Sequence, residues 1–262
     1  KSKLKNNKIN QIYKKFEKSL IIDDKFTVAV SGGPDSLALA FLANIYSIKK
    51  KVPAKFLIVD HKLRSDSTKE ARLVQKLLNS ISIKSEILTW KGKKPLKNIQ
   101  GIARIKRYEL LFKKCDKLKI KDILLGHHQD DLFENFFIRM LRGSGLKGLV
   151  SLDKVSKMSG KRLHRPLLDQ RKKDLVFITK NIFNFYIEDP SNKDEKYQRT
   201  RVRELIFNLQ NNGLEEKKFH KTIKNLKNSN TVVDFYVDEN IKKNTFFLGK
   251  KNKILLNKNF FN

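Results

Sequence analysis

The stretch VAVSGGPDSLALA (residues 28–40) joins two apolar runs through a short segment of glycine, proline, serine and aspartate. Residues 26–30 are few, apolar and partly β-branched, which predicts a buried strand. Apolar side chains after Ser36 recur with a helical period, which predicts a helix over residues 36–50. A strand that turns tightly into a helix is the unit from which α/β sheets are built, so this junction decides the fold class.

The residues at the junction are those of an anion site. Gly32 and Gly33 permit a tight backbone turn and the close approach of a ligand. Pro34 suits the first turn of a helix, where its missing N–H is not needed. The free N–H groups and the dipole at a helix start attract phosphate, and the hydroxyls of Ser31 and Ser36 add donors. We therefore predict a phosphate-binding loop; the alternative is an ordinary tight turn before a buried helix.

Asp35 is the unexpected member of this loop. A carboxylate beside phosphates repels them unless a cation lies between, and Mg²⁺ is the usual cation in that position. No Gly-Lys-Ser/Thr follows, so the loop is not a Walker A motif. The string Ser-Gly-Gly-Pro-Asp-Ser resembles the pyrophosphate-binding loop of the N-type ATP pyrophosphatases, and this resemblance implies ATP as a substrate.

Composition limits the partners and the compartment. The 262 residues include 58 Lys and Arg against 27 Asp and Glu, a net charge of +31. Such a surplus predicts a polyanionic partner, nucleic acid before a membrane surface. The chain has no apolar run of 18 residues and no apolar signal-peptide core at its start, so we expect no membrane span and a cytoplasmic location. The single cysteine, Cys115, excludes an intramolecular disulfide and a metal site made of cysteines alone.

Strands and helices alternate over the first half of the chain. We expect strands at residues 26–30, 55–59, 83–88 and 122–125, and helices at 1–20, 36–50, 67–80, 98–116 and 131–141. The helix at Ser67 begins with a capping box that ends at Glu70. This alternation predicts a parallel sheet with helices on both faces, in which ligands bind beyond the carboxyl ends of the strands.

After residue 143 the pattern weakens. Helices are expected near residues 171–181, 200–209 and 214–228, and strand-like pieces at 232–237, 245–249 and 253–256. A soft boundary near Asn212 divides the chain into a catalytic domain, residues 1–212, and a small, basic, mostly helical region, residues 213–262.

A second constellation lies in GHHQDDLFENFFIRMLRGSGLKGL (residues 126–149). His127, Asp131 and Glu134 are spaced by four and three residues, so they share a helix face at the end of a predicted strand. Such a cluster can bind Mg²⁺, hold a substrate ammonium group or act as a general base. The alternative is a solvated acidic helix start, which explains Asp130 well.

Two further motifs are basic. ARIKRY (residues 103–108) places Arg104 and Arg107 on one helix face, as an arginine clamp on phosphate or carboxylate or as a solvated face. RGSGLKG (residues 142–148) is either a loop that follows an RNA backbone or a flexible connector. Residues 91–121 hold 12 Lys and Arg against 2 Asp and Glu, with few aromatics, which favours contacts with the RNA backbone.

Taken together, SGGPDS, ARIKRY, GHHQDDLFEN with LRGSGLKGL, RPLL and EDPSN resemble, in order and spacing, the tRNA(Ile)-lysidine synthetases. The resemblance spans about residues 26–203. It implies an adenine nucleotide alpha hydrolase-like (PP-loop) fold and modification of the wobble cytidine of an isoleucine tRNA with a CAU anticodon. In that family ATP adenylates O2 of the cytosine with release of pyrophosphate. The amine of free L-lysine then attacks C2 and displaces AMP.

The resemblance also implies roles for individual residues. The positions for ATP are Ala29, Ser31, Gly32, Gly33, Pro34, Asp35, Ser36, Val59, Asp60 and His61. The catalytic positions are Asp35, Arg107, His127, Asp131 and Glu134; of these, Asp35 would hold Mg²⁺, and Asp131 and Glu134 would bind lysine. The positions for tRNA are Lys93, Lys94, Lys97, Arg104, Arg142 and Lys147.

The sequence departs from the family in two places and leaves alternatives open. Only His61 follows the second strand, where many relatives have several histidines, and residues 213–262 are smaller than the C-terminal domain of larger relatives. A tRNA thiolase would need more cysteines than Cys115. An amidating synthetase would leave the charge unexplained, and a non-catalytic RNA-binding protein would leave Asp35 and the acidic cluster unexplained. A homodimer is one alternative for the assembly.

Overall fold

The computed structural model describes residues 6–92, 95, 97, 99–188, 198–248 and 253–261. The chain divides into two compact units, Lys1–Leu132 with Asp153–Tyr197 and Phe133–Leu152 with Gln198–Asn262. The boundary expected near Asn212 falls inside the second unit. The functional division into residues 1–212 and 213–262 remains a prediction.

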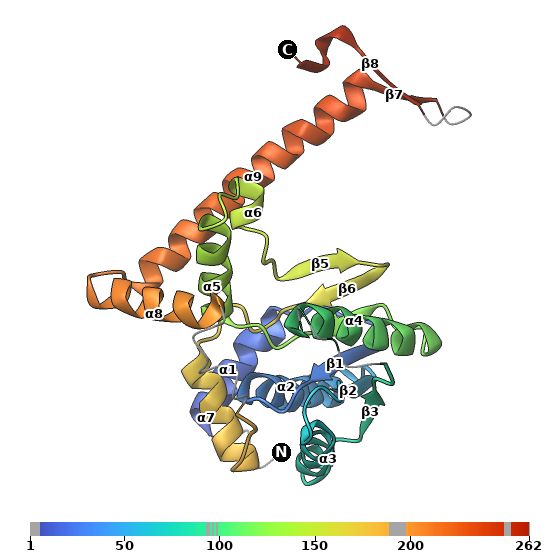
Figure 1. Ribbon diagram of the computed structural model, residues 1–262, viewed down its shortest axis with the longest axis vertical. Helices are drawn as coiled ribbons and strands as arrows, with labels where there is room; N and C mark the ends of the chain where they lie inside the picture. The colour runs from blue at the N-terminus through green and yellow to red at the C-terminus, as the bar shows by residue number, and fades with distance from the viewer. Residues whose placement is uncertain are drawn as a thin grey trace. The chain divides into compact units, whose positions relative to one another are not determined.

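The first unit is built on a six-stranded sheet in the order β3-β2-β1-β4-β6-β5 (Figure 1). The strands are β1 (Phe26–Val30), β2 (Ala54–Asp60), β3 (Ser85–Thr89), β4 (Asp122–Leu124), β5 (Val155–Met158) and β6 (Lys161–His164). All neighbours are parallel except β5, which runs antiparallel to β6 at one edge. The predicted parallel sheet is confirmed, and β5 and β6 are additions to it.

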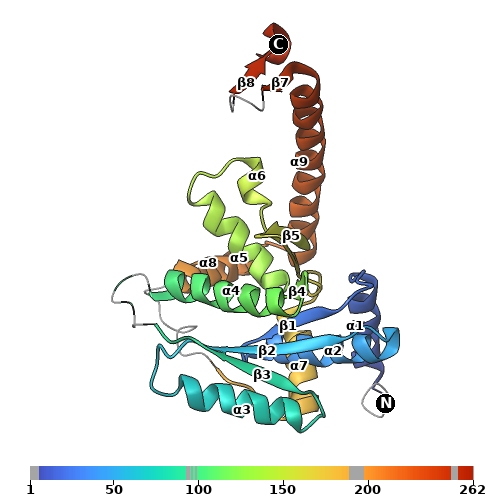
Figure 2. The ribbon, with the colours of Figure 1, turned by 90° about the vertical axis from the view of Figure 1, so that its right-hand side faces the viewer.

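Helices cover both faces of this sheet, as predicted. The helices of the first unit are α1 (Asn7–Lys18), α2 (Pro34–Lys50), α3 (Ser67–Asn79), α4 (Ile99–Lys117) and α7 (Lys172–Phe183). Buried residues of α1, α2, α3 and α7 form one apolar cluster with the strands. Buried residues of α4 form a separate cluster with the strands, and α3 and α4 lie on opposite faces of the sheet (Figures 1 and 2).

The alternation of side chains along β1 explains why two cores form. Val28 and Val30 belong to the cluster with α2, whereas Ala29 packs against the cluster with α4. Thr27 points the same way as Ala29, and its Oγ1 lies 3.5 Å from Sγ of Cys115 on α4. Because successive side chains of a strand face opposite sides, a strand covered on both faces must be apolar almost throughout.

Two glycines let the phosphate-binding loop fit into this frame. Gly32 has φ +91°, and an added Cβ would lie 2.4 Å from Val74 Cγ2. A Cβ on Gly126, just after β4, would lie 3.3 Å from the backbone of Ser36. Gly33 by contrast has φ −70° and nothing within 4 Å of a Cβ. The first two positions therefore require glycine for packing, and Gly33 does not.

The second unit is mainly helical. Its elements are α6 (Leu146–Leu149), α8 (Gln198–Asn211), α9 (Glu216–Asn244), the hairpin β7 (Thr245–Leu248) and β8 (Lys253–Leu256), and the 3₁₀-helix η4 (Lys258–Phe261). The helix α5 (Gln129–Met140) begins in the first unit and continues here. Phe219 of α9 packs on three phenylalanines of α5, with ring centroids 4.9–5.2 Å apart: Phe133, Phe136 and Phe137.

The prediction of a strand at residues 232–237 is wrong, because these residues are part of α9. Their bulky side chains are exposed, Phe235 to 59%, so no sheet face buries them. Asn230 Nδ2 donates to Asp234 Oδ2, and Lys242 pairs with Glu239, which are contacts that only a helix brings together. The strand-like pieces at 245–249 and 253–256 are confirmed as the hairpin β7–β8 within the described residues. Across the described helices, none has the length and apolar content needed to span a bilayer.

We predict that Gly32→Ala destabilises the fold far more than Gly33→Ala. Alanine at a left-handed φ and in contact with Val74 should lower the free energy of unfolding by about 2–4 kcal/mol. The matched change at Gly33 should cost about 1 kcal/mol or less. Urea unfolding of both variants measures this difference, and equal losses would contradict the packing argument.

Candidate nucleotide-binding site

The loop between β1 and α2 is held by one hydroxyl group. The backbone N–H groups of Ser31 and Gly32 donate to Ser36 Oγ over 3.1 and 3.0 Å. The same oxygen donates to the carbonyl of Gly33 over 3.0 Å, and Ser31 Oγ lies 3.2 Å away. The loop thus turns the backbone donors of Ser31 and Gly32 toward one point at the start of α2, which the Ser36 hydroxyl occupies. This is the geometry of an anion-binding nest.

Asp35, in the first turn of α2, has one carboxylate oxygen that could bind a cation. Its Oδ2 faces His128, whereas Oδ1 is buried and accepts no hydrogen bond from the described residues. A buried carboxylate oxygen in this state fits Mg²⁺. The described residues contain no group of three or more His, Cys, Asp or Glu side chains that would hold a metal alone. Mg²⁺ is usually held by one or two carboxylates together with phosphates.

His128 joins Asp35 to Asp131 and is the functional residue that sequence reasoning missed. Its imidazole is buried, with Nε2 3.4 Å from Asp35 Oδ2 and 3.5 Å from Asp131 Oδ2. Burial lowers the pKa of His128, but Asp130, Asp35 and Asp131 together raise it above its ordinary value. Two sequence-predicted residues, Asp35 and Asp131, are therefore brought together, and the histidine between them was not predicted.

The same histidine starts α5. Nδ1 of His128 accepts the N–H of Asp130 over 3.2 Å, and Asp131 Oδ2 accepts the N–H of His128 over 3.0 Å. These two bonds resemble a capping box: the N-cap histidine accepts the N–H of the second helical residue, and the aspartate at the third helical position accepts the N–H of the N-cap residue. Nε2, the other ring nitrogen, faces the carboxylates of Asp35 and Asp131.

The carboxyl end of β2 carries the next group of predicted residues. Asp60 is buried and accepts hydrogen bonds from the N–H of Lys62 and the hydroxyls of Ser67 and Thr68. Burial raises the pKa of Asp60, but these donors hold it below its usual range. The predicted capping box at Ser67 is therefore wrong: its hydroxyl serves Asp60, and Glu70 pairs with Arg64 instead.

His61 and Arg107 meet beside this carboxylate, as expected for one site. Arg107 Nε on α4 donates to His61 Nε2 over 3.4 Å. Burial, and next the charge of Arg107, lower the pKa of His61 to about 4. The imidazole is thus neutral at pH 7, and the arginine lies at the carboxyl edge of the sheet. Ala29 and Val59, the remaining strand positions expected near ATP, lie in β1 and β2.

Glu134 lies in the second unit, and its carboxylate forms an ion pair with an arginine. It is 3% exposed, and Arg203 Nε of α8 donates to its Oε1 over 2.5 Å. His127 is a partly buried residue of the first unit. The roles predicted for Glu134 and His127 stay predictions.

The residues expected to bind tRNA are spread over both units. Arg104, exposed on α4, lies over the ring of Tyr108. Lys97 is exposed, and Lys93 and Lys94 lie outside the described residues. In the second unit Arg142 donates to Gln198, and Lys147 pairs with Asp234.

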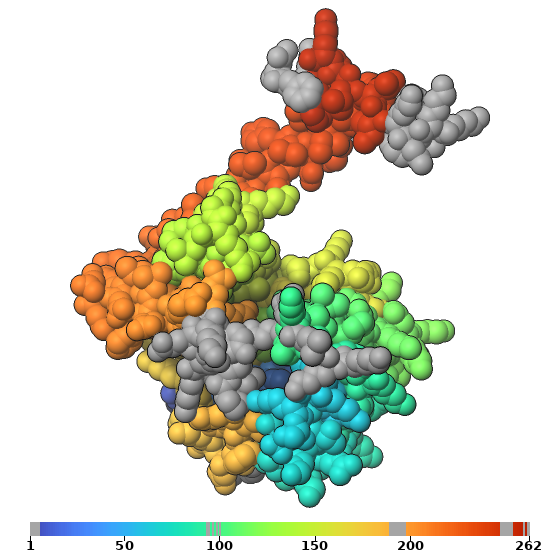
Figure 3. All heavy atoms as spheres, viewed as in Figure 1, coloured from blue at the N-terminus to red at the C-terminus, as the bar shows by residue number. Residues whose placement is uncertain are grey.

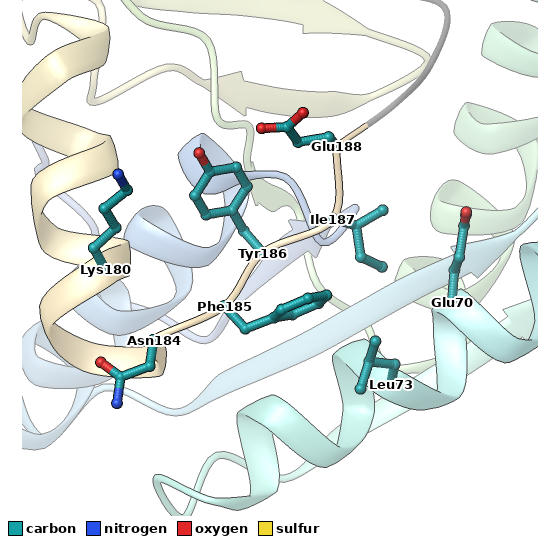
Figure 4. A pocket seen from close by; sticks show the side chains of 8 residues that line it. All are labelled: Glu70, Leu73, Lys180, Asn184, Phe185, Tyr186, Ile187 and Glu188. Carbon is teal, nitrogen blue, oxygen red and sulfur yellow. The ribbon is translucent and has the colours of Figure 1, made fainter.

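A cavity of about 750 Å³ lies between α3 and the segment after α7. Figure 4 shows Phe185 and Ile187 turned toward Leu73 of α3, and in Figure 3 the cyan surface of α3 adjoins the gold surface of α7. The N–H of Ile187 donates to the carbonyl of Gly32, so the cavity adjoins the phosphate-binding loop. None of the predicted site residues lines it.

A parallel sheet with a glycine-containing strand-to-helix loop and polar groups at its carboxyl edge defines an α/β nucleotide-binding protein. Residues 2–210 match the PP-loop domain family, and the chain belongs to that family.

Relatives with curated names support this placement. The chain is 42% identical over 185 residues to tRNA(Ile)-lysidine synthase of Orientia tsutsugamushi, covering 71% of this chain and 42% of that one. It is 33% identical over 214 residues to tRNA(Ile)-lysidine synthase of a Bradyrhizobium species, covering 81% and 60%. The chain thus spans about half the length of these relatives.

One solved structure shares the fold. The U34-tRNA thiolase NcsA from Methanococcus maripaludis superposes with a TM-score of 0.70 at 19% identity, covering 84% of this chain and 78% of that one.

We predict that Arg107→Ala raises the pKa of His61, because a positive charge beside the ring is removed. Titration of the imidazole by NMR should give a midpoint near 4 in the unaltered chain and a higher one in the variant. Arg104→Ala is the matched control and should leave the midpoint unchanged.

The lowered pKa of His61 also makes the free energy of unfolding depend on pH. The folded-state pKa lies below the value of about 6.5 for an unfolded histidine, so protonation of His61 opposes folding. Its contribution to stability is present above about pH 6.5 and is lost as the pH falls toward 4. A His61→Gln variant should lack this part of the acid destabilisation.

Proposed function

We propose that this chain catalyses the ATP-dependent ligation of lysine to C2 of the wobble cytidine of an isoleucine tRNA with a CAU anticodon. The products are a lysidine-containing tRNA, AMP and pyrophosphate. The proposal is carried by the Asp35–His128–Asp131 cluster beside the phosphate-binding loop, in a chain similar to proteins named tRNA(Ile)-lysidine synthase. The net charge of +31 supports an RNA substrate.

In the first step, O2 of the cytosine attacks the α-phosphorus of ATP and pyrophosphate leaves. The N–H groups of Ser31 and Gly32, which donate to Ser36 Oγ in the structure, would turn to the phosphates, where negative charge develops in the transition state. Asp35, through Oδ1, would hold Mg²⁺ against these phosphates, and the cation supplies charge neutralisation. Arg107, at the carboxyl edge beside a neutral His61, would add a second positive charge.

In the second step, the ε-amine of lysine attacks C2 and AMP leaves. A free lysine amine has a pKa near 10.4, so it must be deprotonated before it attacks. We propose Asp131 and Glu134, three residues apart on α5, as the groups that bind this ammonium, one of the two carboxylates accepting its proton before the attack. Asp131 holds its carboxylate against the buried imidazole of His128, which fixes its orientation. Glu134 is paired with Arg203, so a bound ammonium would compete with that guanidinium.

A tRNA thiolase is the alternative that the shared fold raises, because NcsA is one. Iron–sulfur clusters are held by several cysteine thiolates, and sulfur relays need exposed ones. This chain has one cysteine, Cys115, which is buried on α4 beside Thr27. That observation favours ligation over thiolation.

Incorporation of labelled lysine into tRNA tests the proposal. The chain is incubated with ATP, Mg²⁺ and an unmodified isoleucine tRNA with a CAU anticodon, and with methionine tRNA as the control. Label in the isoleucine tRNA alone supports the proposal. Release of AMP without label would mean that a nucleophile other than lysine is used, and absence of both would reject adenylation as well.

We predict that Asp35→Ala lowers lysine incorporation at least 100-fold, because the oxygen proposed to hold Mg²⁺ is lost. Binding of tRNA, measured by filter retention, should change little, since Asp35 carries no positive charge. Asp23→Asn, at an exposed acid before β1, is the matched control and should retain activity. Full activity of Asp35→Ala and Asp35→Asn would remove Asp35 from the metal site.

A further inference from the structure

Arg165, the first residue of the RPLL motif, is a buried cation that the proposed chemistry does not use. It is 6% exposed and follows β6 directly. Its Nη1 donates to the carbonyl of Asp153 and to Ser156 Oγ over 2.8 and 3.0 Å. Its Nε is buried and has no partner within the described residues. One edge of the guanidinium is thus anchored, and the Nε–Nη2 edge is not.

The neighbouring basic side chains of β6 each contact a carboxylate. Lys161 pairs with Asp116, and Arg162 makes a two-pronged contact with Asp122 at 2.6 Å for each bond. His164 also contacts Asp122. No carboxylate of the described residues pairs with Arg165. A buried guanidinium without a counter-ion is costly, so a fold that keeps one gives it an anion from elsewhere.

A second arginine approaches from α4. Arg104 lies 5.3 Å from the ring centroid of Tyr108, and its Nη2 is 3.5 Å from the tyrosine hydroxyl. Tyr108 is buried in the cluster that contains Leu163 of β6, which brings its ring beside the segment carrying Arg165. Burial lowers the pKa of Arg165 most, and the charge of Arg104 lowers it further, whereas Tyr108 and the carboxylate of Asp153 act in the opposite direction. Arg104 also lacks a carboxylate partner among the described residues.

The pair lies at the edge of the sheet where the nucleotide site is found. Arg165 follows the carboxyl end of β6, which pairs in parallel with β4. The end of β4 leads into Gly126 and His128 of the candidate site. Arg104 lies in the second turn of α4, next to the basic stretch of residues 91–97, and α4 crosses this part of the sheet in Figure 2.

We propose that Arg104 and Arg165 together bind one phosphate diester of the RNA backbone, with Tyr108 as the platform between them. Two guanidinium groups that form no ion pair repel each other, and one anion between them offsets this repulsion and gives the buried Nε of Arg165 a partner. The planar fork of arginine matches the oxygens of a phosphate. That this RNA is a tRNA rests on the proposed function.

Binding of unmodified tRNA, measured without ATP or lysine over a series of salt concentrations, tests this inference. Arg104→Ala should weaken binding roughly tenfold and reduce the slope of log K against log salt by about one. Arg165→Ala should do the same, and because one phosphate is shared, the double variant should lose about one in slope rather than two. Arg72→Ala, at an exposed arginine of α3 on the opposite face, is the matched control.

Further measurements separate the alternatives. An unchanged slope in Arg104→Ala, or a loss of two in the double variant, would overturn the shared phosphate site. Loss of ATP binding in equilibrium dialysis with unchanged tRNA binding would overturn the assignment to RNA. If Arg165→Ala fails to fold, Arg165→Lys keeps the charge and should retain the slope. Because no catalysis is required, these results stand apart from the lysine assay.

Discussion

The hydroxyl of Ser36 is the interaction on which the candidate site depends. It accepts the N–H groups of Ser31 and Gly32 and donates to Gly33, so it closes the turn from β1 into α2. The backbone of the same residue lies against Gly126, at the end of β4. One side chain thus shapes the phosphate-binding loop, and its backbone sets how closely the neighbouring strand end approaches. Asp35 and His128 lie opposite each other because of that approach.

The sequence predicts most elements on both sides of α5, including α7, α8 and the hairpin β7–β8, but not β5 and β6, for a physical reason. Central strands such as β1 and β2 are buried on both faces, so their sequences are almost continuously apolar. This pattern predicts them as strands from the sequence alone. The strand β6, Lys161–His164, has three basic residues in four, and their charges are met by Asp116 and Asp122 from distant parts of the chain. No local pattern contains that information, so β5 and β6 were missed.

The site was predictable to the extent that its residues lie at strand ends. Asp35 is predicted by its place in the phosphate-binding loop and Asp131 by its spacing on a helix that follows a strand, and the fold brings both to one imidazole. Of the pair His127-His128, spacing favoured the first, because four residues separate it from Asp131. The structure instead uses His128 as the N-cap of α5, which is a role that serine or aspartate usually fills. The capping box expected at Ser67 failed for a related reason, since buried Asp60 takes the hydroxyl.

Most buried charged groups have partners within the chain, and we infer that the two with an unpartnered atom bind ligands. Asp122 is met by Arg162 and His164, Glu134 by Arg203, and Asp60 by hydroxyl and amide donors. Among the buried, unpartnered side-chain atoms of the described residues, two belong to charged groups: Asp35 Oδ1 and Arg165 Nε. Both follow or face the carboxyl ends of strands in the first unit, where parallel sheets bind ligands. A carboxylate oxygen without a donor fits a cation, and a guanidinium edge without an acceptor fits a phosphate. A nucleotide carried with Mg²⁺ and an RNA backbone together supply both partners, and this agreement links the proposed chemistry to the proposed RNA contact.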